Sequence, residues 1–209
     1  MNSRDKILAQ LRANERPEAH PPAWTSRRNF PDLAERFTTS LRAVAGEVSR
    51  AGSLSEALEQ METILHELNA ERVVANHVPP LSDIDLPGRW PAFNWHIVGQ
   101  TPGDLKAVCA AADVGISGAD AALAETGSVV ISSGPGRSRL ATLLPPVHVA
   151  LVSTTLLTSD LFTWTAARQG DLPANVVLVS GPSKTADIEQ VLAIGVHGPK
   201  RFIVVLYDD

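Results

Sequence analysis

The chain has 209 residues, of which 44% are hydrophobic and 20% are charged. This length suits one globular domain with a short extension, and the balance of residue types is that of a folded protein rather than a disordered one. Its 18 basic and 23 acidic side chains give a net charge of −5. The charge therefore gives no support for nucleic acid as a partner.

Cysteine and histidine usage limits the cofactors that this chain can hold. A single cysteine, Cys109, excludes an intramolecular disulfide and cannot by itself hold a structural zinc ion or an iron–sulphur cluster. None of the six histidines pairs at the i, i+4 spacing of a helical metal site, so we expect no bound metal.

Targeting signals are also missing from the sequence. Residues 1–14 mix charged and apolar side chains and lack the apolar core of a secretory signal. No apolar run approaches the roughly 18 residues that a membrane-spanning helix needs. We therefore expect a cytoplasmic protein without a membrane span.

Charge divides the chain into two parts. Residues 1–52 hold nine basic and six acidic side chains, a net charge of +3, whereas residues 53–209 hold nine and seventeen, a net charge of −8. Within the first part, residues 16–31 contain four prolines and predict an extended connector. We therefore predict an N-terminal helical arm with a proline-rich connector, residues 1–52, and an α/β domain, residues 53–209.

Helical spacing of apolar residues predicts three helices before the first strand. Residues 3–12 form a short amphipathic segment that fits either the chain's own domain or another subunit. Residues 32–48 place apolar side chains every three or four positions, which predicts a second helix. A third begins at Ser53, because Ser53 and Glu56 have the spacing of a capping box ahead of an apolar stripe.

Beyond that helix the pattern changes to short runs rich in β-branched residues. Helical patterns over residues 102–111, 159–169 and 185–194 separate several of these runs, which predicts a mainly parallel sheet with crossover helices. The expected strands are Arg72–Asn76, Trp95–Gly99, Val114–Ser117, Ser128–Ser132, Val147–Val152, Val176–Ser180 and Phe202–Leu206.

The first segment with candidate chemistry is Gly118–Ser128. Two strand-like pieces flank Glu125-Thr126-Gly127 and are expected to pair as a hairpin. Glu125 stands between an apolar run and a glycine turn, where a partly desolvated carboxylate serves as a base or a nucleophile. An equally favoured interpretation is that Asp120 and Glu125 accept hydrogen bonds from turn amides.

Two further segments combine glycines with basic side chains. Residues 132–139 carry Arg137 and Arg139 in a glycine-rich loop, which is typical of a carboxylate or phosphate site. Taken by itself, this segment fits a solvated glycine turn with surface arginines somewhat better. Residues 180–188 read as a strand, a glycine–proline turn and a helix start. From this segment Ser183, Lys184 and Thr185 are predicted to bind an anion together with Arg137 of the 132–139 segment.

Proton transfer is assigned to two side chains near these segments. His197 follows Gly195 in a turn-like setting and is a candidate proton shuttle. Glu125 is the other candidate. Asp187 is expected to cap a helix rather than to react.

These segments resemble a known family. Gly118–Ser128, Ser132–Arg137, Ser180–Glu189 and Gly195–Lys200 match the lactate-utilisation protein C family, the stand-alone LUD domain, in order and spacing. The match extends from about Asp113 to Leu206. This resemblance implies a three-layer α/β sandwich with a mainly parallel sheet, similar to the sugar-phosphate isomerase and coenzyme A transferase superfamily.

The resemblance also implies a role in oxidising L-lactate to pyruvate. It points to iron–sulphur partner proteins that carry the clusters, to no cofactor bound by this chain, and to an accessory or small-anion-binding subunit rather than a complete enzyme. Two alternatives stay open. One is a self-sufficient enzyme that acts on a sugar phosphate or an acyl-coenzyme A through Glu125. The other is a non-catalytic module that senses a small carboxylate.

Overall fold

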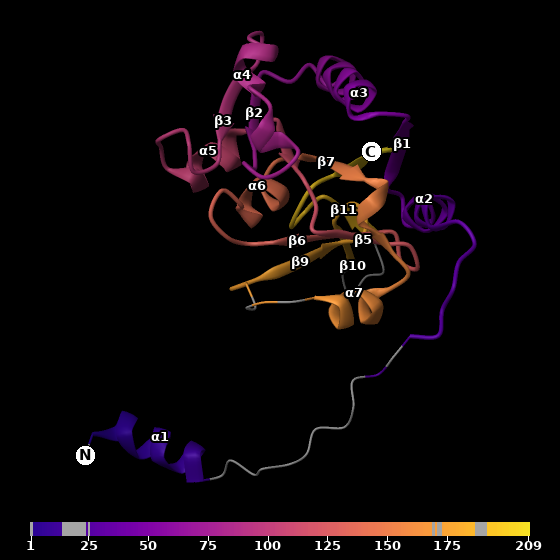
Figure 1. The fold of residues 1–209 in the computed structure, drawn as a ribbon. Helices are drawn as coiled ribbons and strands as arrows, with labels where there is room; N and C mark the ends of the chain where they lie inside the picture. The colour runs from indigo at the N-terminus through magenta and orange to yellow at the C-terminus, as the bar shows by residue number, and fades with distance from the viewer. Residues whose placement is uncertain (1, 14–23, 25, 169, 171–172, 187–191) are drawn as a thin grey trace.

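A computed structural model describes residues 2–13, 24, 26–168, 170, 173–186 and 192–209 (Figure 1). Its centre is a six-stranded sheet with the order β1-β12-β7-β4-β2-β3, in which every pairing is parallel. The strands are β1 (Glu47–Ala51), β2 (Arg72–Ala75), β3 (Asn94–Ile97), β4 (Val114–Ser117), β7 (Val147–Ser153) and β12 (Arg201–Tyr207). The predicted α/β fold with a mainly parallel sheet is confirmed.

Helices cover one face of this sheet. In Figure 1, α3 (Leu54–Glu67) and the short α4 (Leu86–Arg89) lie above it, and the 3-10 turn η1 (Leu81–Asp83) joins the same layer. The predicted cap is present, because the Ser53 hydroxyl accepts a hydrogen bond from the Glu56 amide at 3.2 Å. The buried stripe of α3 packs on the sheet and comprises Ala57, Leu58, Met61 and Leu65.

The opposite face is covered by a mixed layer of helices and strands. It contains α2 (Leu33–Ala43), α5 (Leu105–Ala111) and α6 (Arg139–Leu143). Beside them lies a second sheet with the order β8-β5-β6-β9. Its strands are β5 (Ala121–Leu123), β6 (Ser128–Ser132), β8 (Leu157–Thr158), which follows the 3-10 turn η2 (Thr154–Leu156), and β9 (Val176–Val179).

The second sheet has its own outer cover. β5 and β6 pair antiparallel, which confirms the hairpin expected around Glu125. The last helix, α7 (Leu161–Ala167), lies below this sheet in Figure 1. Trp164 of α7 packs on a small buried cluster formed by Ala121, Leu123 and Val130.

The helix predicted over residues 32–48 is wrong in its second half. α2 ends at Ala43, and Ala45 has a positive φ of 66°, which turns the chain. β1 then pairs in parallel with β12, as in Val48 with Val204. Phe37 and Leu41 of α2 are fully buried against the same face of the sheet. Residues 1–52, delimited from the sequence as an arm, therefore include two elements of the α/β fold.

The helix predicted over residues 185–194 is also wrong where the structure describes it. β10 (Lys184–Ala186) and β11 (Leu192–Ile194) pair antiparallel instead. The Gly195 amide donates to the Ser183 carbonyl at 2.8 Å, so backbone hydrogen bonds run between strands rather than along a helix. Asp187 lies outside the described residues.

The N-terminal helix of the predicted arm is present as α1 (Ser3–Ala13). It buries none of its residues, and Ile7 and Leu11 are both more than half exposed. The structure therefore does not show it packed on the chain's own domain.

Candidate functional site

The strand order locates a crevice between β2 and β4. The chain leaves β2 for β3 on one side, whereas it leaves β4 for β7 and β12 on the other. Ligands of open α/β sheets bind beyond the carboxyl ends of the strands at such a reversal. Asn76 and His77 follow β2 directly, and Gly118 and Asp120 follow β4.

The 132–139 loop crosses this crevice and is fixed to it by backbone contacts. The His77 amide donates to the Gly136 carbonyl at 2.8 Å, and the Ser138 amide donates to Oδ1 of Asn76 at 2.9 Å. Gly136 has a φ of +68°, and a Cβ atom there would lie 2.6 Å from the His77 carbonyl oxygen. Glycine is therefore required for the loop to lie this close to the end of β2.

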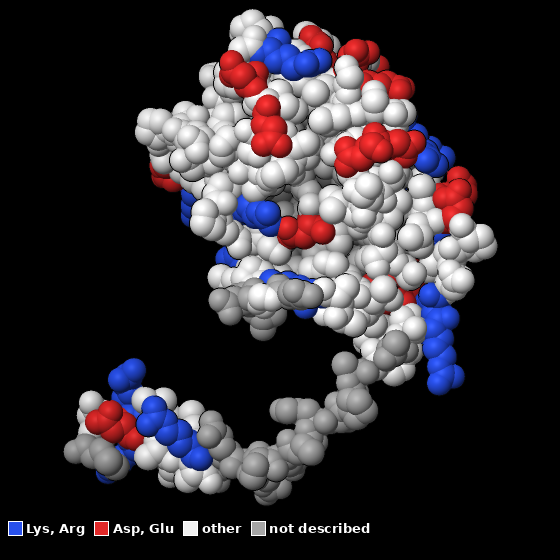
Figure 2. Space-filling model, viewed as in Figure 1, with Lys and Arg blue, Asp and Glu red and all other residues white. Residues whose placement is uncertain are grey.

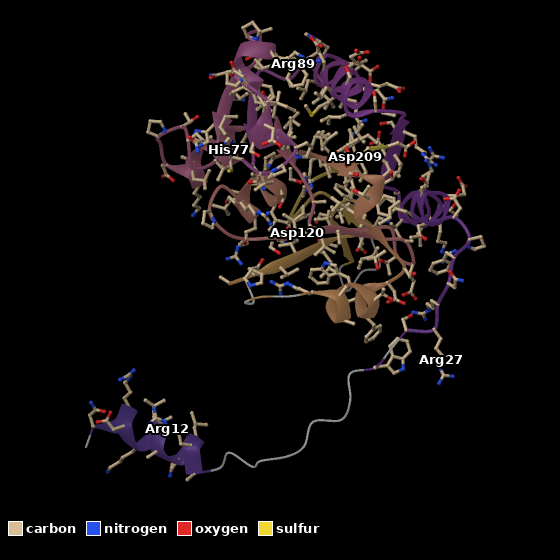
Figure 3. The ribbon with its side chains drawn as sticks, in the orientation of Figure 1. Arg12, Arg27, His77, Arg89, Asp120 and Asp209 are labelled. Carbon is tan, nitrogen blue, oxygen red and sulfur yellow. The ribbon has the colours of Figure 1, made fainter. Side chains whose placement is uncertain are left out.

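Arg137 and Asp120 form an ion pair at the edge of the crevice. An Nη of Arg137 donates to Oδ1 of Asp120, and the Ser132 amide donates to the other carboxylate oxygen at 2.6 Å. Asp120 lies near the middle of the molecule in Figure 3, and basic and acidic side chains meet at the same place on the surface in Figure 2. The pair holds the guanidinium of Arg137 at a defined position while a third of its side chain stays exposed.

A cleft of about 560 Å³ opens beside this ion pair, and we call it the Arg137 cleft. Arg168 also lines it, with its guanidinium carbon 5.9 Å from the centroid of the Trp164 ring. Two guanidinium groups and two serines suit a carboxylate or a phosphate. The lining residues are Asp120, Ser132, Ser133, Gly134, Pro135, Arg137, Trp164, Arg168 and Pro173.

A smaller cavity of about 10 Å³ lies behind the ion pair, with Asn76, Asp120 and Arg137 in its wall. Asn76 is only 1% exposed, and its Nδ2 has no hydrogen-bond partner among the described residues. This volume is about that of one water-sized probe. The cavity is therefore large enough for about one water molecule, and a buried donor without a partner belongs to one of its lining residues.

Glu125 lies at the β5–β6 turn and is not among the residues lining the Arg137 cleft. Its carboxylate pairs with Arg28, and its carbonyl accepts a hydrogen bond from the Ser40 hydroxyl at 3.1 Å. Next to it, the Ser26 hydroxyl donates to Asp160. The turn is thus where the predicted connector is anchored to the domain, through Ser26 and Arg28.

Burial raises the pKa of Asp160, but hydrogen bonds from Ser26 and Thr163 and the charge of Arg28 outweigh it, so that the pKa is lowered overall. The carboxylate of Asp160 is therefore ionised where it caps α7.

The structure separates Arg137 from the other predicted anion ligands. Lys184 donates from Nζ to the carbonyl of Val44, the C-cap residue of α2, at 2.7 Å. The backbone amide of Ser183 donates to the Pro199 carbonyl, and Thr185 pairs with Ala193 in the β10–β11 hairpin. None of these three lines the Arg137 cleft.

His197 is exposed in the turn that precedes Lys200 and does not line the cleft either. The predicted site residues thus lie in three places: the cleft, the β5–β6 turn and the β10–β11 hairpin.

Two buried groups with shifted pKa values belong to the core. Burial lowers the pKa of His148 to about 3, and its Nε2 lies 2.8 Å from the Ser117 hydroxyl. Burial raises the pKa of the Cys109 thiol to about 11. Both groups are therefore neutral at pH 7, and neither provides a charge to a ligand.

Three residues of the site were not singled out in the sequence. Trp164 lies in the middle of α7 and Arg168 is its C-cap, far from the 132–139 loop in sequence, and Asn76 was expected only as the last residue of a strand. Within the part of the chain that the structure describes, no group of three or more His, Cys, Asp or Glu side chains is placed to hold a metal ion. Nor is any described helix long and apolar enough to cross a membrane.

Comparison with known proteins agrees with the fold and the motifs. The family model of the LUD domain matches residues 34–207. Lactate utilization protein C of Halalkalibacterium halodurans is 33% identical over 162 residues, which cover 74% of this chain and 70% of that protein. Lactate utilization protein C of an Exiguobacterium species is 40% identical over 124 residues, covering 56% of this chain and 53% of that protein.

Two further matches extend over most of the chain. Lactate utilization protein C 1 of Bacillus mycoides is 29% identical, with 100% of this chain and 98% of that protein covered. The crystal structure of a DUF162 family protein from Deinococcus radiodurans superposes with a TM-score of 0.58 at 17% identity, covering 84% of this chain and 96% of that one. That structure supports the fold. The matched domain and the relatives together show that this chain belongs to the LUD domain family, among proteins of the lactate utilization protein C type.

Proposed function

We propose that this chain is a cytoplasmic component of an L-lactate utilisation system that oxidises L-lactate to pyruvate with iron–sulphur partner proteins. In this proposal it acts as an accessory subunit that binds a small carboxylate or phosphate. The observation that carries the proposal is the Arg137 cleft, in which two guanidinium groups line a crevice at the strand reversal. The relatives named for lactate utilisation supply the physiological setting.

Electron transfer is assigned to the partner proteins because of the thiol chemistry of this chain. Its one cysteine, Cys109, is fully buried, and its raised pKa keeps it a thiol rather than a thiolate. Iron–sulphur clusters need several thiolate ligands. We therefore assign no iron–sulphur cluster to this chain and place the clusters in the partners.

Anion binding is assigned to Arg137 because its guanidinium is both positioned and accessible. Asp120 accepts a hydrogen bond from one Nη of the group, and Arg137 lines the cleft with a third of its side chain exposed. A carboxylate or phosphate can take bidentate hydrogen bonds from such a group. Glu125 and His197, predicted to move protons, are not part of this proposal, because neither lines the cleft.

Co-purification tests the subunit role. The tagged chain is purified gently from its native cells grown on lactate, its companions are identified, and the material is assayed for lactate-dependent dye reduction. We expect cysteine-rich proteins and dye reduction, and a loss of dye reduction with intact assembly for Arg137→Ala. A chain that reduces dye without companions, or that binds no companion under cross-linking, contradicts the subunit role.

Calorimetry tests the anion site separately. The hydrogen bonds of a charged group contribute about 1.5–3 kcal/mol, so Arg137→Ala should weaken binding of inorganic phosphate or L-lactate by about tenfold or more. Lys184→Met is the matched control and should bind as the parent does, because Lys184 donates to the Val44 carbonyl and does not line the cleft. Equal losses in both variants would restore the single cradle predicted from the sequence and contradict the site described here.

A further inference from the structure

The Arg137 cleft is larger than a small anion requires. Its volume of about 560 Å³ falls in the range of roughly 300–1,000 Å³ that holds ligands of drug or cofactor size. A lactate or phosphate ion is only a few times the size of a water molecule, whose share of liquid volume is about 30 Å³. One small anion therefore fills a minor part of the cleft, and most of its wall would face solvent.

The wall beyond Arg137 suits a flat aromatic group. Trp164 packs with one side on the small cluster of Ala121, Leu123 and Val130, and the rest of its half-buried ring lines the cleft. The guanidinium of Arg168 lies over the same ring. Indole rings and guanidinium planes both stack on aromatic ligands.

Backbone hydrogen bonds hold the 133–137 wall of the cleft. The Gly134 and Arg137 amides and carbonyls bond to one another at 3.2 Å and 2.9 Å, and the Ser133 amide donates to the Asn175 carbonyl at 2.9 Å. Pro135 and Pro173 add stiff apolar surface on the two sides. The 133–137 side of the cleft is thus held by backbone hydrogen bonds.

From these observations we infer that the Arg137 cleft binds a phosphorylated aromatic heterocycle of the mononucleotide type. Its phosphate takes the hydrogen bonds of Arg137, and its ring lies against Trp164 and Arg168. This inference rests on the anion site of the proposed function and extends its ligand class from a small anion to a nucleotide. Two sources share this chemistry, a purine mononucleotide and a flavin mononucleotide.

Binding to the whole chain is measured by calorimetry with four probes: adenosine monophosphate, flavin mononucleotide, inorganic phosphate and L-lactate. We expect at least one mononucleotide to bind about tenfold more tightly than phosphate, since stacking of one base on an aromatic side chain contributes that much. The mononucleotide that binds more tightly identifies the ring. If neither binds more tightly than phosphate, the inference is wrong.

Variants locate the ring. Trp164→Leu keeps an apolar side chain on the cluster and should remove the tenfold preference while the phosphate affinity stays as in the parent. Trp24→Leu is the control, because Trp24 is exposed, contacts Phe162 and does not line the cleft. A mononucleotide preference that survives in Trp164→Leu, with unfolding by urea unchanged, would overturn the placement of the ring.

Two outcomes separate this inference from the proposed function. A mononucleotide preference together with no lactate-dependent dye reduction in any preparation would leave the inference standing and remove the role in lactate oxidation. If Arg137→Ala loses dye reduction but the parent shows no mononucleotide preference, the role in lactate oxidation stands and the mononucleotide inference is wrong.

Discussion

Two segments of this chain follow the same pattern in different surroundings. Gly134-Pro135-Gly136-Arg137 and Gly181-Pro182-Ser183-Lys184 each join a glycine–proline turn to a basic residue. The first lies at the carboxyl ends of β2 and β4 and forms a wall of the cleft. The second packs on the end of α2 and continues into β10.

The partner of each basic side chain explains the difference. Arg137 pairs with the carboxylate of Asp120 at the rim of a cleft, where its other donors stay available. Lys184 donates to the Val44 carbonyl at the C-terminus of α2. A cation there gives a helix-end carbonyl a hydrogen-bond donor and interacts favourably with the helix dipole. A basic residue after a glycine turn thus lines a cleft in one place, where we propose that it binds an anion, and caps a helix in the other.

The first glycine of each segment also differs in how closely it is packed. A Cβ atom on Gly134 would meet no heavy atom within 4 Å. Gly181 has a φ of +118°, and a Cβ atom there would lie 2.9 Å from the Val44 carbonyl oxygen. The second segment therefore depends on glycine for packing, whereas the first of the two glycines in the 132–139 loop does not.

The largest effect is expected for Gly181→Ala. An L side chain is strained at this φ and crowds the Val44 carbonyl, so the variant should lose about 1–3 kcal/mol of unfolding free energy. Gly134→Ala is the matched control and should change stability by less than about 0.5 kcal/mol. Urea unfolding measures both.

A Gly181→Ala protein as stable as the parent would break the comparison, because it would mean that the segment is not pressed against α2. The same result would follow from a Gly134→Ala protein that is as unstable as Gly181→Ala. Phosphate binding by folded Gly181→Ala should match that of the parent, since the residue does not line the Arg137 cleft.

An effect of similar size is expected when the pH is lowered, and it comes from a histidine outside both segments. His148 has its pKa lowered to about 3 by burial, whereas in the unfolded chain it titrates near 6.5. Between these values the unfolded state binds more protons. Stability is therefore complete above about pH 6.5 and falls as the pH decreases, by about 2 kcal/mol between pH 7 and pH 5.

Urea unfolding at the two pH values checks this dependence. His148→Gln should remove most of it, whereas His197→Gln, which changes the exposed histidine beside the second segment, should leave it intact. A pH dependence that follows His197 instead would mean that the second segment carries chemistry of its own. In the parent, the His148 imidazole resonances should not titrate above pH 5.

The central strands could be predicted because burial on both faces leaves a clear pattern. All seven residues of β7 are buried, and its run of apolar residues is unambiguous in the sequence. β1 could not be found in this way. It lies at the edge of the sheet and buries only Val48 and Ala51, and Val48 also fits the helical spacing of the residues before it.

Tertiary pairing decides the hairpin and the site. Lys184, Thr185 and Ala186 have no strong strand signal, and they become extended because β11 and the turn at Gly195 provide hydrogen-bond partners. The sequence identified the 132–139 loop and Arg137. It could not show that Arg168 and Trp164 reach the same cleft, because a sequence pattern describes single elements and not which helix packs beside which loop.

The smallest effect is expected for Lys184→Met, and it tests the comparison most directly. A cation at a helix C-terminus contributes about 0.3–1 kcal/mol at an exposed site, so the variant should lose about 0.5 kcal/mol of unfolding free energy. Lys106→Met is the control for loss of one positive charge. Lys106 lies in the first turn of α5, where its charge opposes the helix dipole, and its removal should cause no loss.

A cap and an anion ligand differ in a second respect, the response to phosphate. Phosphate stabilises a protein in proportion to its binding to the folded state, so the parent, Lys106→Met and Lys184→Met should gain the same stability from it. Arg137→Ala should gain much less. If Lys184→Met also lost this gain, Lys184 would reach the bound anion despite its bond to Val44, and the two glycine–proline segments would form one site.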